Sequence, residues 1–153
     1  MKAKIVLGLG FGDEAKGVVT DSLISSPKTI VVRFSGGQQA GHTVMRDGEK
    51  HIFSNYCAGA LQGCPSYFSE HTSFYLNTIA VEKKKLEKLG GNTNLTIHPF
   101  AKVTTPADIA YNIITEKKNN HGSCGLGIAA TQKRHNETPY KLYALDLMNS
   151  VMF

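Results

Sequence analysis

The sequence predicts an α/β protein whose mainly parallel sheet is flanked by helices. Short apolar runs alternate with segments of helical periodicity, which is the order expected of strand–helix–strand units. The first two apolar runs, 5–7 and 29–34, each lead straight into a glycine-rich turn. A short helix is predicted between them, so the two strands should be parallel and joined by a right-handed crossover.

Length and composition narrow the class of protein further. We expect the 153 residues to form a single α/β domain over 1–153. No apolar stretch approaches the ~20 residues that span a bilayer, and no signal peptide precedes the first strand, so we expect a cytoplasmic protein without membrane contact. The net charge of +5 suits an anionic ligand but is too small and too scattered to indicate nucleic acid.

The first half of the chain predicts one helix and one hairpin between its strands. The helix follows the first glycine turn and covers Gly17 to Ser25, where Ser26-Pro27 ends it. The hairpin has Arg46-Asp47-Gly48-Glu49 as its turn and His51-Ile52-Phe53 as its return strand. The inner face predicted for the helix consists of Val18, Val19, Ser22 and Leu23.

The second half carries three helix-start signals, with buried strands predicted at 73–76 and 95–97. Asn77 can cap a helix that Gly90-Gly91 ends. Thr105-Pro106-Ala107-Asp108 supplies a capping hydroxyl, a proline at the first helical position and a carboxylate in the first turn. Thr138-Pro139 repeats this signal. The apolar stripes of the three helices are Ile79, Leu86 and Leu89; Ile109, Ile113 and Ile114; and Leu142, Leu145 and Leu147.

The first glycine-rich turn, Gly8 to Gly17, has the chemistry of a phosphate site without matching the common fingerprints. Asp13 stands where a dinucleotide-binding fingerprint needs glycine, and the hydroxyl that follows the lysine of a Walker A loop is missing. Backbone N–H groups at a helix start, backed by the Lys16 ammonium, still favour phosphate oxygens. An ionised carboxylate at Asp13 or Glu14 can ligate Mg²⁺ or accept a proton from a substrate N–H.

The second glycine-rich turn, Ser35 to Thr43, contributes a histidine. His42 can donate a hydrogen bond to an oxygen that gains negative charge. Alternatively, the glycines mark a tight turn and His42 is merely exposed. Since both turns follow strands of one predicted sheet, we expect the reactive side chains of the two turns at one sheet edge.

A third glycine-rich loop covers residues 119–127 and carries Ser123 and Cys124. It is either a surface turn or a further wall of a shared ligand cleft. The basic cluster Lys133-Arg134-His135 is likewise either a surface loop or a phosphate clamp.

Together the first two turns resemble the signature of the adenylosuccinate synthetase family, Gly-x-Gln-Trp-Gly-Asp-Glu-Gly-Lys-Gly-Lys followed by Arg-x-x-Gly-Gly-x-Asn-Ala-Gly-His-Thr. The likeness continues through Gly48-Glu49-Lys50 and, more weakly, to Gly125-x-Gly127, which looks like the family's Thr-Thr-Gly-Arg-Gly loop. It implies a P-loop-NTPase-like α/β fold that is incomplete here, because family members are much longer. The matching residues are Gly8, Gly12-Asp13-Glu14, Lys16 and Gly17 in the first motif, and Arg33, Gly36-Gly37 and Ala40-Gly41-His42-Thr43 in the second.

This resemblance implies a homodimeric ligase that joins inosine monophosphate to aspartate through a 6-phosphoryl intermediate, with GTP as phosphate donor and Mg²⁺ as cofactor. Asp13 would take the N1 proton of the purine and ligate Mg²⁺ with the Gly41 carbonyl. His42 would stabilise charge on the 6-oxygen, and Lys16 would hold phosphoryl oxygens. The implied nucleotide-binding residues are Gly12, Asp13, Glu14, Ala15, Lys16, Gly17, Gln39, Ala40, Gly41, His42, Thr43, Ser123 and Cys124, with Arg134 as the nearest candidate for the intersubunit phosphate-binding arginine.

Several positions depart from the family pattern. Ala15 replaces a glycine, and its methyl group costs roughly 1 kcal/mol or more if the position needs a positive φ. The family's guanine-recognition and aspartate-binding segments have no counterpart here. The alternative is therefore a truncated, non-catalytic nucleotide-binding or oligomerisation module of the same fold. The other replacements are Gly10-Phe11 for Gln-Trp, Val18 for Lys, Gln39 for Asn, Ser123-Cys124 for Thr-Thr and Leu126 for Arg.

Overall fold

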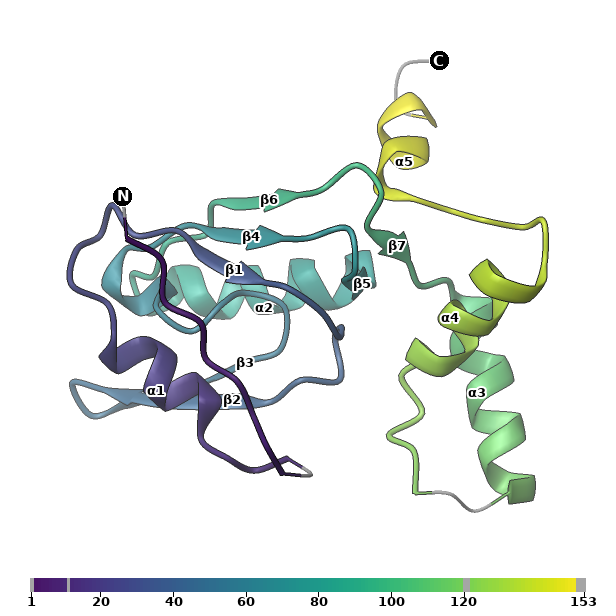
Figure 1. The fold of residues 1–153 in the computed structure, drawn as a ribbon, viewed down its shortest axis with the longest axis horizontal. Helices are drawn as coiled ribbons and strands as arrows, with labels where there is room; N and C mark the ends of the chain where they lie inside the picture. Colours follow the sequence, from purple (N-terminus) through teal and green to yellow (C-terminus); the bar gives the residue numbers. More distant parts are fainter. Residues whose placement is uncertain (1, 11, 120–121, 151–153) are drawn as a thin grey trace.

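The computed structural model describes residues 2–10, 12–119 and 122–150 and confirms the α/β class with a parallel sheet (Figure 1). Strands β1 (Val31–Arg33), β4 (Ser66–Phe68) and β6 (Leu95–Ile97) form a three-stranded parallel sheet in that order. Two short strands, β5 (Ser73–Phe74) and β7 (Lys102–Val103), form a second parallel pair. β6 lies where the sequence predicts it, and β5 is a shorter form of the strand predicted at 73–76.

The strand predicted at 5–7 is wrong. The residues before α1 (Lys16–Ser22) have no regular secondary structure among 2–10, and Ile5 and Leu7 are 82% and 75% exposed. β1 is an edge strand paired only with β4, and its flanking side chains Val32 and Phe34 are also exposed. The N-terminal run therefore neither pairs with this open edge nor covers its apolar side chains, and apolar sequence alone does not stabilise a strand.

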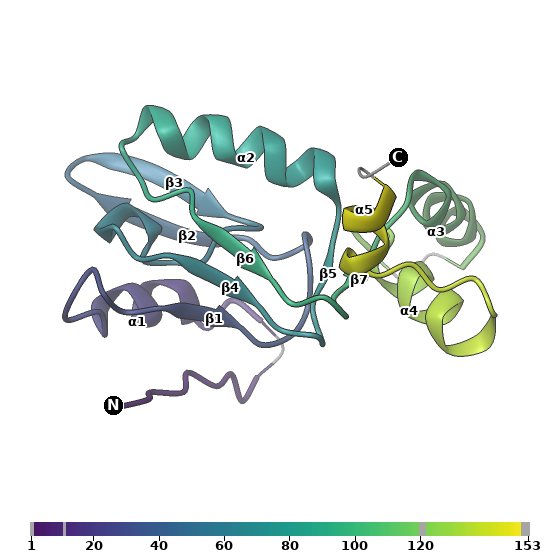
Figure 2. The ribbon, with the colours of Figure 1, turned by 90° about the horizontal axis from the view of Figure 1, so that it is seen from above.

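The predicted hairpin is confirmed. β2 (His42–Arg46) pairs antiparallel with β3 (Glu49–Phe53), with His42 opposite Phe53 and Arg46 opposite Glu49. Asp47 and Gly48 both have positive φ, 51° and 84°, as a two-residue turn of the primed type requires. The hairpin lies beside α1 in both views, so the start of β2 is close to the first glycine turn (Figures 1 and 2).

Two helix predictions need correction, one at its C-terminal end and one at its N-terminal end. α1 ends three residues earlier than predicted, and Val18, Val19, Ser22 and Leu23 are exposed, leaving Gly17 as its buried residue. α2 (Leu76–Lys88) follows Tyr75 and has no side-chain cap, so Asn77 lies inside the helix rather than capping it. The stop signal of α2 is confirmed, because Gly90 has φ 70° and the Gly91 N–H donates to the Leu86 carbonyl at 3.0 Å.

The C-terminal region holds three helices. α3 (Pro106–Asn119) starts as predicted, with the Thr105 N–H donating to Asp108 at 2.8 Å and the Asp108 N–H donating to Thr105 Oγ1 at 3.2 Å. α4 (Ile128–Glu137), which was not predicted, packs against α3 (Figure 1). α5 (Ala144–Ser150) begins beyond the predicted Thr138-Pro139 signal, because that segment is extended.

The core forms two apolar clusters that meet at Ile79 of α2 and Leu95 of β6. The first joins the hairpin, the 3-10 turn at Ala60–Gln62 and Leu86 of α2. The second joins β4, β5 and β7 to Ala144 at the start of α5. Ile113 and Ile114 of the predicted α3 stripe are exposed and belong to neither cluster. No helix in the described part of the chain is long and apolar enough to cross a bilayer.

Candidate functional site

The second glycine turn is held in place by Arg33 at the end of β1. Arg33 is only 8% exposed, and its guanidinium donates to the carbonyls of Gly37 at 3.1 Å, Ser54 and Tyr56 at 3.4 Å. Burial lowers the pKa of Arg33, which the charges of neighbouring groups partly offset. The Arg33 of the family motif thus has a structural role in this chain, since it fixes the loop that presents His42.

A close backbone approach brings the first and second turns together. A Cβ atom at Gly17 would lie 2.5 Å from the Cβ of His42, so α1 can start beside β2 only because position 17 is glycine. Burial, followed by the charges of Arg33 and Lys16, lowers the pKa of His42. The imidazole is therefore neutral at pH 7. In this form one ring nitrogen carries a hydrogen and can donate a hydrogen bond, and the other can accept one.

The first turn is strained and largely exposed. Gly12, Asp13 and Ala15 have φ values of 119°, 53° and 55°, so the chain passes through the left-handed region three times in four residues. Asp13 is exposed, whereas Glu14 folds back and contacts both the Lys16 Nζ and the Gly10 N–H. These contacts, with that to Lys16 the largest, lower the pKa of Glu14.

The oxygen donors predicted to hold Mg²⁺ fit a hard cation. They are the exposed carboxylate of Asp13 and the backbone carbonyl of Gly41, and Mg²⁺ in nucleotide sites takes one or two carboxylates together with phosphate oxygens. Within residues 2–10, 12–119 and 122–150, no three His, Cys, Asp or Glu side chains cluster as a ready-made metal site. A phosphate-bearing ligand would have to complete the coordination.

The third loop meets the second turn through a residue that the sequence analysis did not select. The Gln38 side chain is 4% exposed and donates through Nε2 to the Leu126 carbonyl at 2.9 Å. A Cβ at Gly37 would lie 2.6 Å from Cδ1 of Ile128, so the second turn also packs against the start of α4. Gln39, the predicted nucleotide contact, is exposed beside this contact. Only the buried environment of position 38 distinguishes Gln38 from Gln39, and sequence does not reveal it.

The remaining third-loop predictions lie on the outer side of this contact. Ser123 exchanges hydrogen bonds with Asn112 of α3 at 3.0 and 3.4 Å, and Cys124 is exposed. Phe11 of the first turn and residues 120–121 of the third loop lie outside the described residues.

Arg134 forms an internal ion pair. Its Nε donates to Asp108 at 2.9 Å, and its terminal nitrogens donate to Asp108 and to the carbonyls of Val103 and Tyr140 at 2.7–2.9 Å. Burial alone raises the pKa of Asp108, but the hydrogen bonds from Arg134 and Thr105 outweigh it and leave that pKa lowered. These contacts tie α4 to the start of α3, so a phosphate would have to compete for the same guanidinium.

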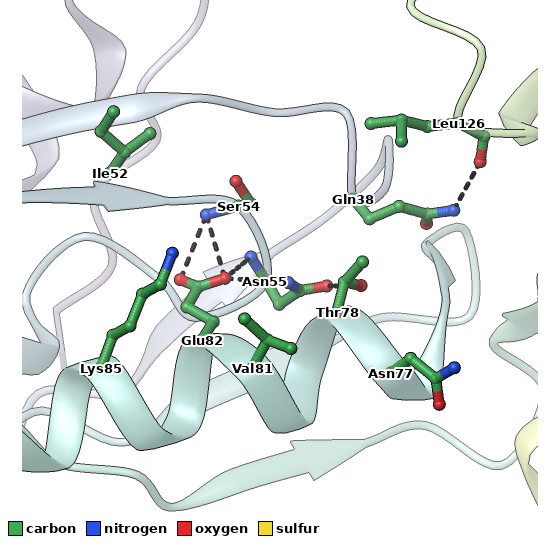
Figure 3. A pocket seen from close by; sticks show the side chains of 10 residues that line it. All are labelled: Gln38, Ile52, Ser54, Asn55, Asn77, Thr78, Val81, Glu82, Lys85 and Leu126. Atoms are coloured by element: carbon green, nitrogen blue, oxygen red, sulfur yellow. Dashed lines mark hydrogen bonds between the residues drawn. The ribbon is translucent and has the colours of Figure 1, made fainter.

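A cavity of about 370 Å³ lies between the second turn, β3 and α2 (Figure 3). Gln38 and Leu126 line one part of it, and Glu82 lines another. Glu82 is 6% exposed and accepts hydrogen bonds from the N–H groups of Ser54, Asn55 and Tyr56 at 2.6–3.2 Å. The buried carboxylate thereby fixes the segment whose carbonyls receive Arg33.

Comparison with known proteins decides the family. The family model described as adenylosuccinate synthetase matches residues 5–149. The chain belongs to this family. It is 31% identical over 151 residues to the adenylosuccinate synthetase of Picrophilus torridus, covering 96% of this chain and 36% of that protein. It is 35% identical over 117 residues to that of Fusobacterium nucleatum, covering 76% and 27%.

Solved structures of two synthetases share the fold of this chain. The fully ligated adenylosuccinate synthetase of Plasmodium falciparum matches with a TM-score of 0.74 at 19% identity, over 95% of this chain and 38% of that one. The succinoaminodeoxyadenylate synthetase of cyanophage S-2L, bound to dGMP and dATP as an energy donor, matches with a TM-score of 0.57 at 15% identity, over 89% and 37%. The chain thus spans about a third of the length of the adenylosuccinate synthetases it matches.

Proposed function

We propose that this chain supplies the phosphate-holding and proton-moving loops of an adenylosuccinate synthetase, a ligase that joins inosine monophosphate and aspartate at the expense of GTP. The main support for the proposal is the packing of Gly17 against His42. This contact places the two motifs that the family resemblance assigns to catalysis next to each other. The proposed cytoplasmic location and homodimeric assembly rest on the same resemblance.

The proposed reaction begins with a proton transfer to Asp13. Asp13 accepts the N1 proton of the purine, which leaves negative charge on the 6-oxygen for attack on the γ-phosphorus of GTP. The bond from that phosphorus to its bridging oxygen breaks and GDP leaves. The amine of aspartate then attacks C6, loses a proton and displaces the 6-phosphate.

Two further groups would stabilise charge during phosphoryl transfer. Neutral His42 donates a hydrogen bond to the 6-oxygen, and Lys16 holds the phosphoryl oxygens. Asp13 and the Gly41 carbonyl would hold Mg²⁺, which neutralises charge on the phosphates when bound. The exposed backbone N–H groups of the first turn would also donate hydrogen bonds to phosphate oxygens.

A second candidate is a nucleotide-binding or oligomerisation module without catalysis. The internal ion pair of Arg134 favours it, because that guanidinium is the nearest candidate for the phosphate-binding arginine of the family and is already used within the chain. The ligase and a nucleotide-binding module share nucleotide binding and differ in turnover, whereas an oligomerisation module needs neither.

Calorimetric titration and an activity assay separate the candidates. The chain is titrated with inosine monophosphate and with GTP in the presence of Mg²⁺, and adenylosuccinate formation is followed after addition of aspartate. Binding with turnover that falls 10²- to 10⁴-fold in Asp13→Asn supports the ligase. Binding without turnover supports the nucleotide-binding module. No heat with either nucleotide at millimolar concentration refutes the ligase and the nucleotide-binding module and leaves the oligomerisation module. Asp47→Asn, an exposed carboxylate in the hairpin turn, is the matched control.

A further inference from the structure

The carboxylate of Glu14 lies in a cradle of the first turn. One of its oxygens contacts the Lys16 ammonium and the other accepts the Gly10 N–H. The Glu14 side chain is 22% exposed although the residues on either side of it are exposed. Glu14 thus points back into the turn that it belongs to.

Two glycines make room for this carboxylate. A Cβ at Gly8 would lie 2.0 Å from Glu14 Oε2, and one at Gly10 would lie 3.0 Å from Oε1. The cradle is therefore a space bounded by glycine backbone, an N–H donor and an ammonium, and an anionic group occupies it. Donors of this kind serve carboxylate and phosphate oxygens equally.

We propose that Glu14 is an internal competitor for the phosphate donor, occupying the Gly10 N–H and the Lys16 ammonium until a polyphosphate displaces it. This inference rests on the proposed function, which assigns the same turn to the phosphates. It changes the role implied for Glu14 by the family resemblance, since its backbone can bind nucleotide while its side chain opposes binding.

The competition is weak enough to be reversible. The Lys16 side chain is 36% exposed, and an ion pair at such a site is modest because water and salt screen it. The apparent affinity equals the intrinsic affinity multiplied by the fraction of molecules whose cradle is open, so a small open fraction weakens binding. If roughly a tenth to a third are open, removing the competitor tightens binding about three- to tenfold.

Titration of the whole chain with inorganic tripolyphosphate, and separately with GTP, tests this role. Tripolyphosphate isolates the phosphate site from guanine recognition. We expect Glu14→Gln to bind both ligands about three- to tenfold more tightly than the parent chain. Glu14→Asp, whose carboxylate is one methylene shorter and cannot reach both donors, should lie between them. The Lys16→Gln change should weaken binding in either background.

The control for net charge is Glu137→Gln, the last residue of α4, which is a different element from the first turn. Its affinity should equal that of the parent chain. Equal or weaker binding by Glu14→Gln, with the parent chain still binding, refutes the competitor and leaves the proposed function intact. Absence of heat from the parent chain and from both Glu14 variants refutes the competitor and the proposed phosphate site together.

Discussion

Replacing Glu82 by glutamine should destabilise the chain more than any exposed charge change. One Glu82 oxygen accepts from the N–H and side-chain amide of Asn55, and the other from the N–H of Tyr56, with both near the N–H of Ser54. Glutamine keeps one acceptor oxygen and presents an NH₂ group in place of the other. Whichever oxygen is lost, at least one buried backbone N–H faces a donor.

The magnitude follows from those contacts. A buried donor left without its acceptor costs about 1–3 kcal/mol, and repulsion from the new NH₂ adds to this. We expect Glu82→Gln to lower the free energy of unfolding by about 2–4 kcal/mol, a large share of the roughly 5–15 kcal/mol of a typical domain. In urea denaturation followed by circular dichroism, the midpoint should fall by about 1–2 M.

The matched control is Glu87→Gln on the same helix. Glu87 and Lys83 are half-exposed with their charged atoms 3.8 Å apart, so this change should cost less than about 0.5 kcal/mol. A Glu82→Gln chain within 0.5 kcal/mol of the parent, at the same urea slope, would show that the carboxylate does not hold residues 54–56.

Three further outcomes follow from individual contacts. Ala15→Gly should raise the melting temperature, because relief of the left-handed backbone is worth about 1 kcal/mol; an unchanged or lower value would contradict the strain. Arg134→Lys should lower the free energy of unfolding by about 1–3 kcal/mol through loss of the forked contact with Asp108, and a loss as small as that of Lys133→Gln would contradict it. Burial, with the charges of Arg134 and Lys102, lowers the pKa of His135, so the unfolded chain takes up the proton first as pH falls. The stability from neutral His135 is present above about pH 6.5 and is lost as pH falls below that value through the lower folded pKa. Melting temperatures between pH 8 and 5 should show this decline, and His135→Gln should flatten it.

Features that depend only on neighbouring residues could be predicted from the amino-acid order. The hairpin turn needs two residues of positive φ, and Asp47-Gly48 supplies them locally. The α3 start needs only a hydroxyl and a carboxylate three residues apart, as in Thr105 and Asp108. The two glycine motifs likewise indicated the family without knowledge of the fold.

The fold was needed to show which side chains have partners elsewhere in the chain. The run containing Ile5 has strand composition but is unpaired and exposed in the fold, and Arg134 looks like a free cation until the fold brings Asp108 to it. Gln38 and Gln39 are the same residue type, yet one is buried against the Leu126 carbonyl and the other is exposed. Local patterns record backbone preferences, whereas burial and pairing arise from residues distant in sequence, so these assignments required the folded chain.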